Sequence, residues 1–139
     1  MPYPEHLVEP MRQEAVAAGC EELRSAEDVE AAISKGGTSL FFINSVCGCA
    51  AGMARPGLAH ALKTSDIKPD NAYTVFAGND IDAVNAVRAS FVGMPPSSPC
   101  MGLLKDGQLV SMVHRLDIEG HSAQQVSDKL KEIFQDNCQ

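Results

Sequence analysis

The first 36 residues carry apolar side chains at helical spacing. One hydrophobic face is formed by residues 7–15, and we expect Pro10 to start or kink this helix because proline lacks the backbone N–H donor. Ser25 and Asp28, three residues apart, predict the capped start of a second helix that ends at a pair of glycines. The pattern therefore predicts a helical extension over residues 1–36.

A strand, a helix and a second strand are predicted next. Residues 39–44 are apolar at successive positions, as in a strand that is buried on both faces. A helical pattern follows from Cys47 to about Lys63, and Pro56 is expected to kink it. Residues 73–77 predict a second buried strand. A strand, a helix and a strand at this spacing predict a right-handed crossover unit with parallel strands.

The last third of the chain predicts a helix, a hairpin and a final helix. Residues 81–91 carry a hydrophobic face, on which Ile81 is the first side chain expected to point inward. Two short strands flank Asp106-Gly107, a dipeptide that tolerates the positive φ angles of a type I′ turn. Ser122 is expected to cap the last helix, which has an apolar face.

The order of these elements predicts the fold class. A β-α-β unit followed by a helix and then by β-β-α implies a central mixed sheet of four strands with helices on both faces. This α/β three-layer arrangement is thioredoxin-like. With 139 residues, 45% of them hydrophobic, the chain can build one core, so we expect a single domain over residues 1–139.

Charge and hydropathy limit the partners that this protein can have. Eighteen acidic side chains against eleven basic ones give a net charge of −7, which repels phosphate backbones and argues against nucleic acid. No apolar stretch approaches the roughly 18 residues of a spanning helix, and the charged opening does not resemble a signal peptide. We therefore expect a cytoplasmic protein without a membrane partner.

Cysteines carry the candidate chemistry. In a reducing cytosol, thiols usually stay free, catalytic or metal-bound. Cys47 and Cys49 lie where the first buried strand meets its helix, and N–H groups at a helix start lower the pKa of a thiol by stabilising the thiolate. The Cys47-Gly48-Cys49 segment is therefore the candidate reactive centre. The chain has five cysteines in all: Cys20, Cys47, Cys49, Cys100 and Cys138.

The one-residue spacing predicts what kind of redox pair this is. Cysteines two positions apart on a regular helix point to nearly opposite sides, so a Cys47–Cys49 disulfide needs a distorted first turn, which Gly48 permits. Such a strained disulfide would be easy to reduce. The spacing therefore favours thiol exchange or isomerisation over strong reduction.

Two other interpretations of the pair stay open. Both side chains can simply fill space as small hydrophobic groups. Alternatively, the two thiolates can bind zinc or copper(I), with His114, Cys100 or Cys138 completing the ligand set of a metal carrier. The sequence contains no second closely spaced ligand pair, so our preferred interpretation includes no metal.

Ser98-Pro99 precedes the first hairpin strand. In a thioredoxin-like fold a cis-proline at this place faces the redox cysteines, although most X-Pro bonds in folded proteins are trans. Cys100 begins the adjacent strand. It is either a small buried hydrophobic residue or an additional resolving thiol for the pair.

These segments together resemble the bacilliredoxin family, also described as thioredoxin-like disulfide isomerases with a C-x-C motif. A lone C-x-C motif is weakly specific, but the extended cysteine segment together with the later Ser-Ser-Pro is much more specific. The resemblance runs nearly end to end and includes Pro10-Met11-Arg12, Asn44 to Gly52, Ala54-Arg55-Pro56, Thr74 to Gly78, Pro96 to Pro99, Glu119-Gly120-His121 and Cys138.

The resemblance implies a thiol-disulfide oxidoreductase that removes bacillithiol, a low-molecular-weight thiol, from protein mixed disulfides formed during oxidative stress. Cys47 would attack the mixed disulfide, and Cys49 or another thiol, with Cys138 as a candidate, would resolve the intermediate. The partners would be bacillithiolated or disulfide-bonded client proteins, and the chemistry needs no metal or organic cofactor. Disulfide isomerase activity is the alternative within this fold. Arg55, about two helical turns from Cys47, is expected to be a helix-surface or packing residue.

Overall fold

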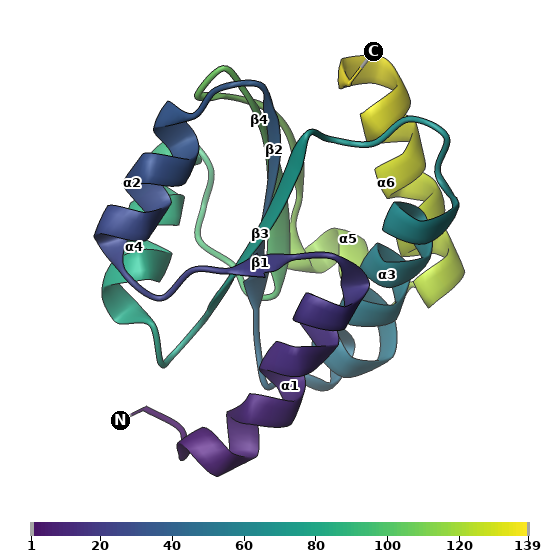
Figure 1. The fold of residues 1–139 in the computed structure, drawn as a ribbon. Coiled ribbons are helices and arrows are strands. Elements are labelled where there is room, and N and C mark those ends of the chain that lie inside the picture. The colour runs from purple at the N-terminus through teal and green to yellow at the C-terminus, as the bar shows by residue number, and fades with distance from the viewer. Residues whose placement is uncertain (1, 139) are drawn as a thin grey trace.

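The computed structural model describes residues 2–138 and has a mixed five-stranded sheet at its centre (Figure 1). The strand order is β1-β3-β2-β4-β5. β1, β3 and β2 are parallel neighbours, whereas β2, β4 and β5 pair in antiparallel fashion. The strands are β1 (Glu21–Glu22), β2 (Thr38–Asn44), β3 (Asn71–Phe76), β4 (Cys100–Lys105) and β5 (Gln108–Val113).

One strand of this sheet is absent from the sequence prediction. Glu21 and Glu22 pair in parallel with Tyr73 and Thr74, so β1 adds an edge to β3. Two adjacent acidic residues have no strand periodicity, and pairing with an existing edge requires only backbone groups. The prediction of four strands was therefore wrong, whereas the three-layer thioredoxin-like arrangement is confirmed.

Helices cover both faces of the sheet (Figure 1). On one face lie α1 (Glu5–Ala18), α3 (Arg55–Thr64) and α6 (Ala123–Asn137), and on the other lie α2 (Ala26–Ser34) and α4 (Ile81–Ser90). The short α5 (Arg115–Ile118) follows β5 and buries Ile118 with the first group. The first 36 residues thus contribute one helix to each of the two helical layers and the strand β1 to the sheet.

Strand β2 separates two hydrophobic cores. All seven of its residues are buried, as the uninterrupted apolar run predicts. Because side chains alternate along a strand, Leu40 and Phe42 pack beneath α1, α3 and α6, whereas Phe41 and Ile43 pack beneath α2 and α4. The alternation thus places neighbouring apolar residues of β2 in different cores.

Several local predictions are confirmed. The hydroxyl oxygen of Ser122 accepts the N–H of Gln125 at 3.1 Å, which caps α6. Asp106 and Gly107 have φ angles of 51° and 83°, as a type I′ turn requires. Ile81 is an exception, because 56% of its surface is exposed and the buried face of α4 begins only at Ala83.

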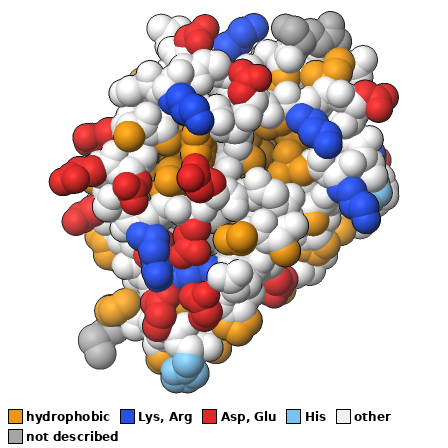
Figure 2. All heavy atoms as spheres, in the orientation of Figure 1, with side chains coloured by type: hydrophobic (Ala, Val, Ile, Leu, Met, Phe, Trp, Pro, Cys, Tyr) orange, Lys and Arg blue, Asp and Glu red, His pale blue; other side chains and the backbone are white. Residues whose placement is uncertain are grey.

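A buried arginine ties α1 to the sheet. Arg12 is only 2% exposed, and its guanidinium donates two hydrogen bonds to Asp80, at 2.8 and 2.9 Å. Further bonds reach Glu22 and Glu5. Acidic side chains are numerous on the face shown in Figure 2, in keeping with the net charge of −7. Among residues 2–138, no helix has the length and apolar character needed to cross a membrane.

Candidate active site

The cysteine motif lies between β2 and a helix, as predicted. The carbonyl oxygen of Cys47 accepts hydrogen bonds from the N–H groups of Ala50 and Ala51, at 3.0 and 3.3 Å. A π-helical turn, η1 (Ala50–Ala54), follows and continues directly into α3. Pro56 lies in the first turn of α3, directly after this π-helical turn, where the sequence predicted a single helix from Cys47 kinked at Pro56.

The two thiols of the motif are close together but differ in exposure. The Sγ atoms of Cys47 and Cys49 are 2.6 Å apart, and all five cysteines, which lie within the described residues, are free thiols. Cys47 is half-buried, whereas Cys49 is 6% exposed and belongs to the core beneath α3 and α6. An external disulfide can therefore reach the sulfur of Cys47 more readily than that of Cys49.

The two thiols also differ in acidity. The hydrogen bond from the Cys49 thiol lowers the pKa of Cys47, and the N–H groups of Cys49 and Ala50 and the charge of Arg115 act in the same direction, against partial burial. Burial, together with the hydrogen bond and charge of Cys47, raises the pKa of Cys49 to about 11. The pair thus favours the thiolate at Cys47 and the protonated thiol at Cys49.

A buried polar network holds the loop that leads to Cys47. Ser45 Oγ accepts the N–H of Cys47 at 3.0 Å, and Asn44 Oδ1 accepts the N–H of Ser45 at 2.9 Å. Arg55 donates to Asn44 Oδ1 at 2.9 Å and to the Ser45 carbonyl at 3.0 Å. Arg55 is 3% exposed, and its Nε donates to Glu14 at 3.1 Å. Of the two roles expected for Arg55, the structure shows packing, with a polar function that the sequence did not suggest.

Ser98 and Pro99 lie next to this loop. The Ser98–Pro99 peptide bond is cis. Cys100 is paired with Ile43 in the antiparallel β2–β4 ladder, so one further step of the same register brings Pro99 opposite Asn44. The structure therefore brings the predicted Ser98-Pro99 segment to the end of β2 from which the cysteine motif continues.

Gly48 has no special conformation in the reduced pair. Its φ angle is outside the left-handed region, and a Cβ built at this position would meet no heavy atom of the described chain within 4 Å. An alanine would thus fit here. The glycine is not required by the free-thiol geometry, and its predicted role in a distorted disulfide turn stays a prediction.

Cys100 faces away from the redox pair. It is fully buried among the residues beneath α2 and α4, whereas Cys49 belongs to the core on the opposite face of the sheet. Burial raises the pKa of Cys100 to about 11. The structure does not bring Cys100 to the pair, and its environment is that of a small buried hydrophobic residue, as is the environment of Cys20.

Cys138 is also distant from the pair. It caps the C-terminal end of α6, and burial raises the pKa of its thiol, an effect that the side chain of Thr38, the first residue of β2, partly offsets. Cys47 follows the last residue of that strand. The seven residues of β2 span about 20 Å from first to last at roughly 3.3 Å per step, so the two thiols lie at opposite ends of the sheet.

Arg115 is a site residue that the sequence analysis missed. Its backbone N–H donates to Ser97 Oγ at 3.3 Å, and its guanidinium donates to the Ser98 carbonyl at 3.4 Å and to Glu119 at 2.7 Å. Its positive charge acts on both thiols of the motif. Its position directly after the hairpin could have indicated this role. The second strand of a hairpin returns to the end where the first strand began, which here is the end next to Ser98-Pro99.

An open groove lies beside the cis-proline segment. Its volume is about 510 Å³, and Leu116 on its wall is 83% exposed. His114, considered above as a metal ligand, is part of this wall, and within residues 2–138 no three His, Cys, Asp or Glu side chains are grouped to hold a metal ion. The lining residues are Pro95, Pro96, Ser97, His114, Arg115, Leu116, Asp117 and Glu119.

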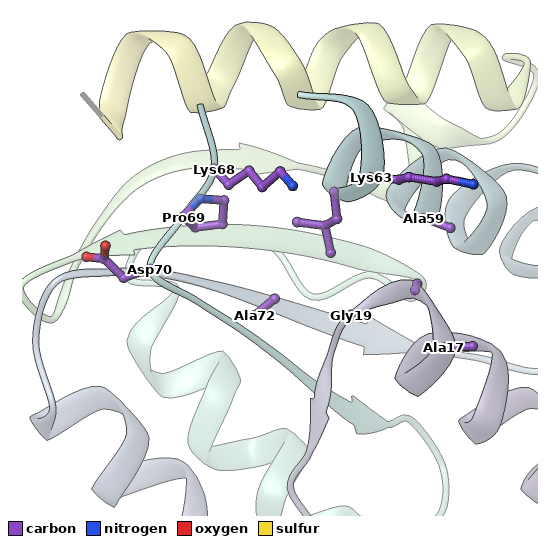
Figure 3. A pocket seen from close by; sticks show the side chains of 10 residues that line it. Ala17, Gly19, Ala59, Lys63, Lys68, Pro69, Asp70 and Ala72 are labelled. Atoms are coloured by element: carbon purple, nitrogen blue, oxygen red, sulfur yellow. The ribbon is translucent and has the colours of Figure 1, made fainter. Parts of the chain in front are cut away.

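A second cavity lies far from the motif. It occupies about 400 Å³ between the ends of α1 and α3 and the start of β3, where Lys63, Lys68 and Asp70 are among its lining residues (Figure 3). Its lining residues include no cysteine. Because β3 is parallel to β2, this cavity lies at the end of the sheet opposite Cys47.

Fold and site together define a thiol redox protein with a thioredoxin fold. Two solved structures share the fold, each at low sequence identity. A thioredoxin from Halobacterium salinarum is 16% identical with a TM-score of 0.58, covering 88% of this chain and 94% of its own. Thioredoxin O1 from Arabidopsis thaliana is 17% identical with a TM-score of 0.57, covering 87% of this chain and 99% of its own.

Sequence relatives define the family. The family model described as disulphide isomerase matches residues 3–138. A bacilliredoxin of Geobacillus kaustophilus is 55% identical over 96% of this chain and 91% of its own length. A bacilliredoxin of Salinibacter ruber is 48% identical over 99% of this chain and 82% of its own length. The chain therefore belongs to the bacilliredoxin family.

Proposed function

We propose that this protein removes bacillithiol from mixed disulfides on client proteins, with Cys47 as the attacking thiol. The observation that carries the proposal is the asymmetry of the pair, in which an accessible sulfur with a lowered pKa lies 2.6 Å from a buried, protonated one. Relatives named bacilliredoxin support bacillithiol as the thiol that is removed. The clients would be cytoplasmic proteins modified during oxidative stress.

In the first step, the Cys47 thiolate attacks the bacillithiol sulfur of the mixed disulfide. A new bond forms between Cys47 and bacillithiol, the original disulfide breaks, and the client leaves as a thiolate that takes a proton from water. No net oxidation occurs in this exchange. The lowered pKa of Cys47 favours this step because the thiolate is the nucleophile.

In the second step, Cys49 releases bacillithiol from Cys47. Once Cys47 is in a mixed disulfide, its negative charge no longer opposes ionisation of Cys49. The Cys49 thiol gives its proton to water and its thiolate attacks the sulfur of Cys47; bacillithiol leaves as a thiolate that takes up a proton, and a Cys47–Cys49 disulfide remains. An external dithiol or other thiol reductant must supply two electrons to complete the cycle.

Adduct removal from a bacillithiolated client, followed by mass spectrometry, tests the proposal. The wild-type protein should remove the adduct, Cys47→Ser should not, and Cys49→Ser should accumulate bacillithiol on Cys47. Cys100→Ser is the matched control because that thiol is buried on the other face of the sheet. The proposal is wrong if the wild-type protein does not remove the adduct.

Disulfide isomerisation is the second candidate, supported by the description of the matching family. In that reaction Cys47 would attack a client disulfide, and another client thiol would later displace it, so Cys49 would not be consumed. Recovery of activity of a scrambled disulfide protein should then persist in Cys49→Ser. Loss of that recovery in Cys49→Ser would favour the bacillithiol reaction instead.

A further inference from the structure

Arg115 is held in place by the segment that contains the cis-proline. The Ser97 hydroxyl accepts its backbone N–H, and the Ser98 carbonyl accepts a hydrogen bond from its guanidinium. Glu119, one turn further along, accepts the Nε–H at 2.7 Å. These contacts fix the backbone of Arg115 at one point and its side chain at two, although the side chain is 43% exposed.

The same segment lies beside the redox pair. The β2–β4 register brings Pro99 opposite Asn44, and the loop from Asn44 to Cys47 is itself fixed by hydrogen bonds. Because the guanidinium of Arg115 binds Ser98, its positive charge is held close to the thiols. In agreement with this placement, the charge of Arg115 favours the ionised form of both Cys47 and Cys49.

We propose that Arg115 is a positioning residue of the redox site whose anchored guanidinium stabilises the thiolate on Cys47 before attack and on Cys49 during resolution. The overall charge of −7 makes such a local cation important, because the acidic surface otherwise disfavours a further negative charge. Only the catalytic consequence of this proposal rests on the proposed function. The effect on thiolate formation is a property of the protein without any client.

Arg88 provides a matched control. It donates to the carbonyl of Ser97 at 3.0 Å, so it also contacts the cis-proline segment, but it comes from α4 on the opposite face of the sheet. Its charge acts on Cys100, which is in the other core. Arg88→Gln thus disturbs the same segment without removing the cation that acts on the redox pair.

The test measures how fast iodoacetamide alkylates Cys47 in reduced protein across a range of pH, with the modified residue identified by mass spectrometry. Arg115→Gln should slow alkylation at neutral pH by about threefold or more, whereas the rates should converge at alkaline pH where the thiol is ionised in both proteins. Arg115→Lys, which keeps the charge, should recover most of the rate, and Arg88→Gln should behave like the wild type.

Salt provides a readout that a purely structural role would not change. Because Arg115 is partly exposed, high ionic strength should screen its charge and slow wild-type alkylation towards the Arg115→Gln rate, with a smaller effect on the variant. An unchanged rate in Arg115→Gln, or a drop of equal size at every pH, would overturn the proposal. If these results hold but the wild type removes no bacillithiol, only the proposed function fails.

Discussion

The guanidinium of Arg55 donates a 2.9 Å hydrogen bond to the side-chain oxygen of Asn44 and thereby connects the first turn of α3 to the last residue of β2. The cysteine motif lies between these two elements. Because Arg55 also donates to the Ser45 carbonyl, the loop is fixed on both sides of its first peptide bond. The geometry of Cys47 thus depends on a residue two helical turns away.

Replacement of Arg55 by lysine should weaken the fold and slow the reaction of Cys47. Lysine is shorter and carries its charge on one nitrogen, so it cannot replace the Nη1 bonds to Asn44 and Ser45 and the Nε bond to Glu14 together. We expect a loss of about 1–3 kcal/mol in the free energy of unfolding, measured by urea titration. The rate of Cys47 alkylation should fall as well.

Arg24→Lys is the control for that substitution. Arg24 is 49% exposed and pairs with Glu5 and Glu22 on the surface, so its replacement should change stability by less than about 0.5 kcal/mol. Equal effects of the two substitutions would contradict a positioning role for Arg55.

Stability should fall at alkaline pH because of the buried thiols. Burial raises the pKa of Cys20 to about 12 and of Cys100 to about 11, both above the ordinary value of 9.0. Between pH 9 and 11 the unfolded state therefore binds fewer protons than the folded state, and the free energy of unfolding decreases as pH rises. Each thiol contributes a slope of up to about 1.4 kcal/mol per pH unit in this window.

Urea midpoints measured at several pH values from 7 to 11 test this expectation. Cys100→Ala removes one of the titrating groups and should make the decline shallower, although it also leaves a small cavity that lowers stability at every pH. A decline of equal steepness in the variant would mean that Cys100 is not one of the groups responsible.

Replacement of Cys138 by serine should leave resolution of the bacillithiol intermediate unchanged to within about twofold. The reason is distance, because the thiol of Cys138 lies near Thr38, whose side chain acts on its pKa, at the opposite end of β2 and about 20 Å from the pair. Single-turnover release of bacillithiol from Cys47 is the measurement. A slower release that depends on protein concentration would instead indicate resolution by Cys138 of a second molecule.

Two glycines near the site should respond differently to alanine. A Cβ at Gly57 would lie 2.8 Å from the side chain of Val126 and 2.9 Å from the carbonyl oxygen of Ala123, so α3 and α6 could not keep their close approach. We expect Gly57→Ala to cost about 1–3 kcal/mol. A Cβ at Gly52 would meet no described heavy atom within 4 Å, and thermal unfolding of Gly52→Ala should be nearly unchanged.

The sequence by itself determined the elements and the location of the reactive motif. The apolar run of β2, the Asp106-Gly107 turn and the Ser122 cap all depend on neighbouring residues, and each formed as predicted. The position of Cys47 between a strand and a helix could be predicted because the patterns of both elements are local as well. Periodicity and turn chemistry are local properties, so they can be recognised without knowledge of the fold.

Only the tertiary structure decided which distant residues join the motif. The edge strand β1 forms because the edge of β3 is available, and Arg55 and Arg115 reach the site from a helix and from the end of a hairpin. The structure also directs Cys100 to the opposite core and Cys138 to the opposite end of the sheet. Strand register, burial of a charge and the face on which a side chain lies arise from contacts between distant segments, which the local pattern does not contain.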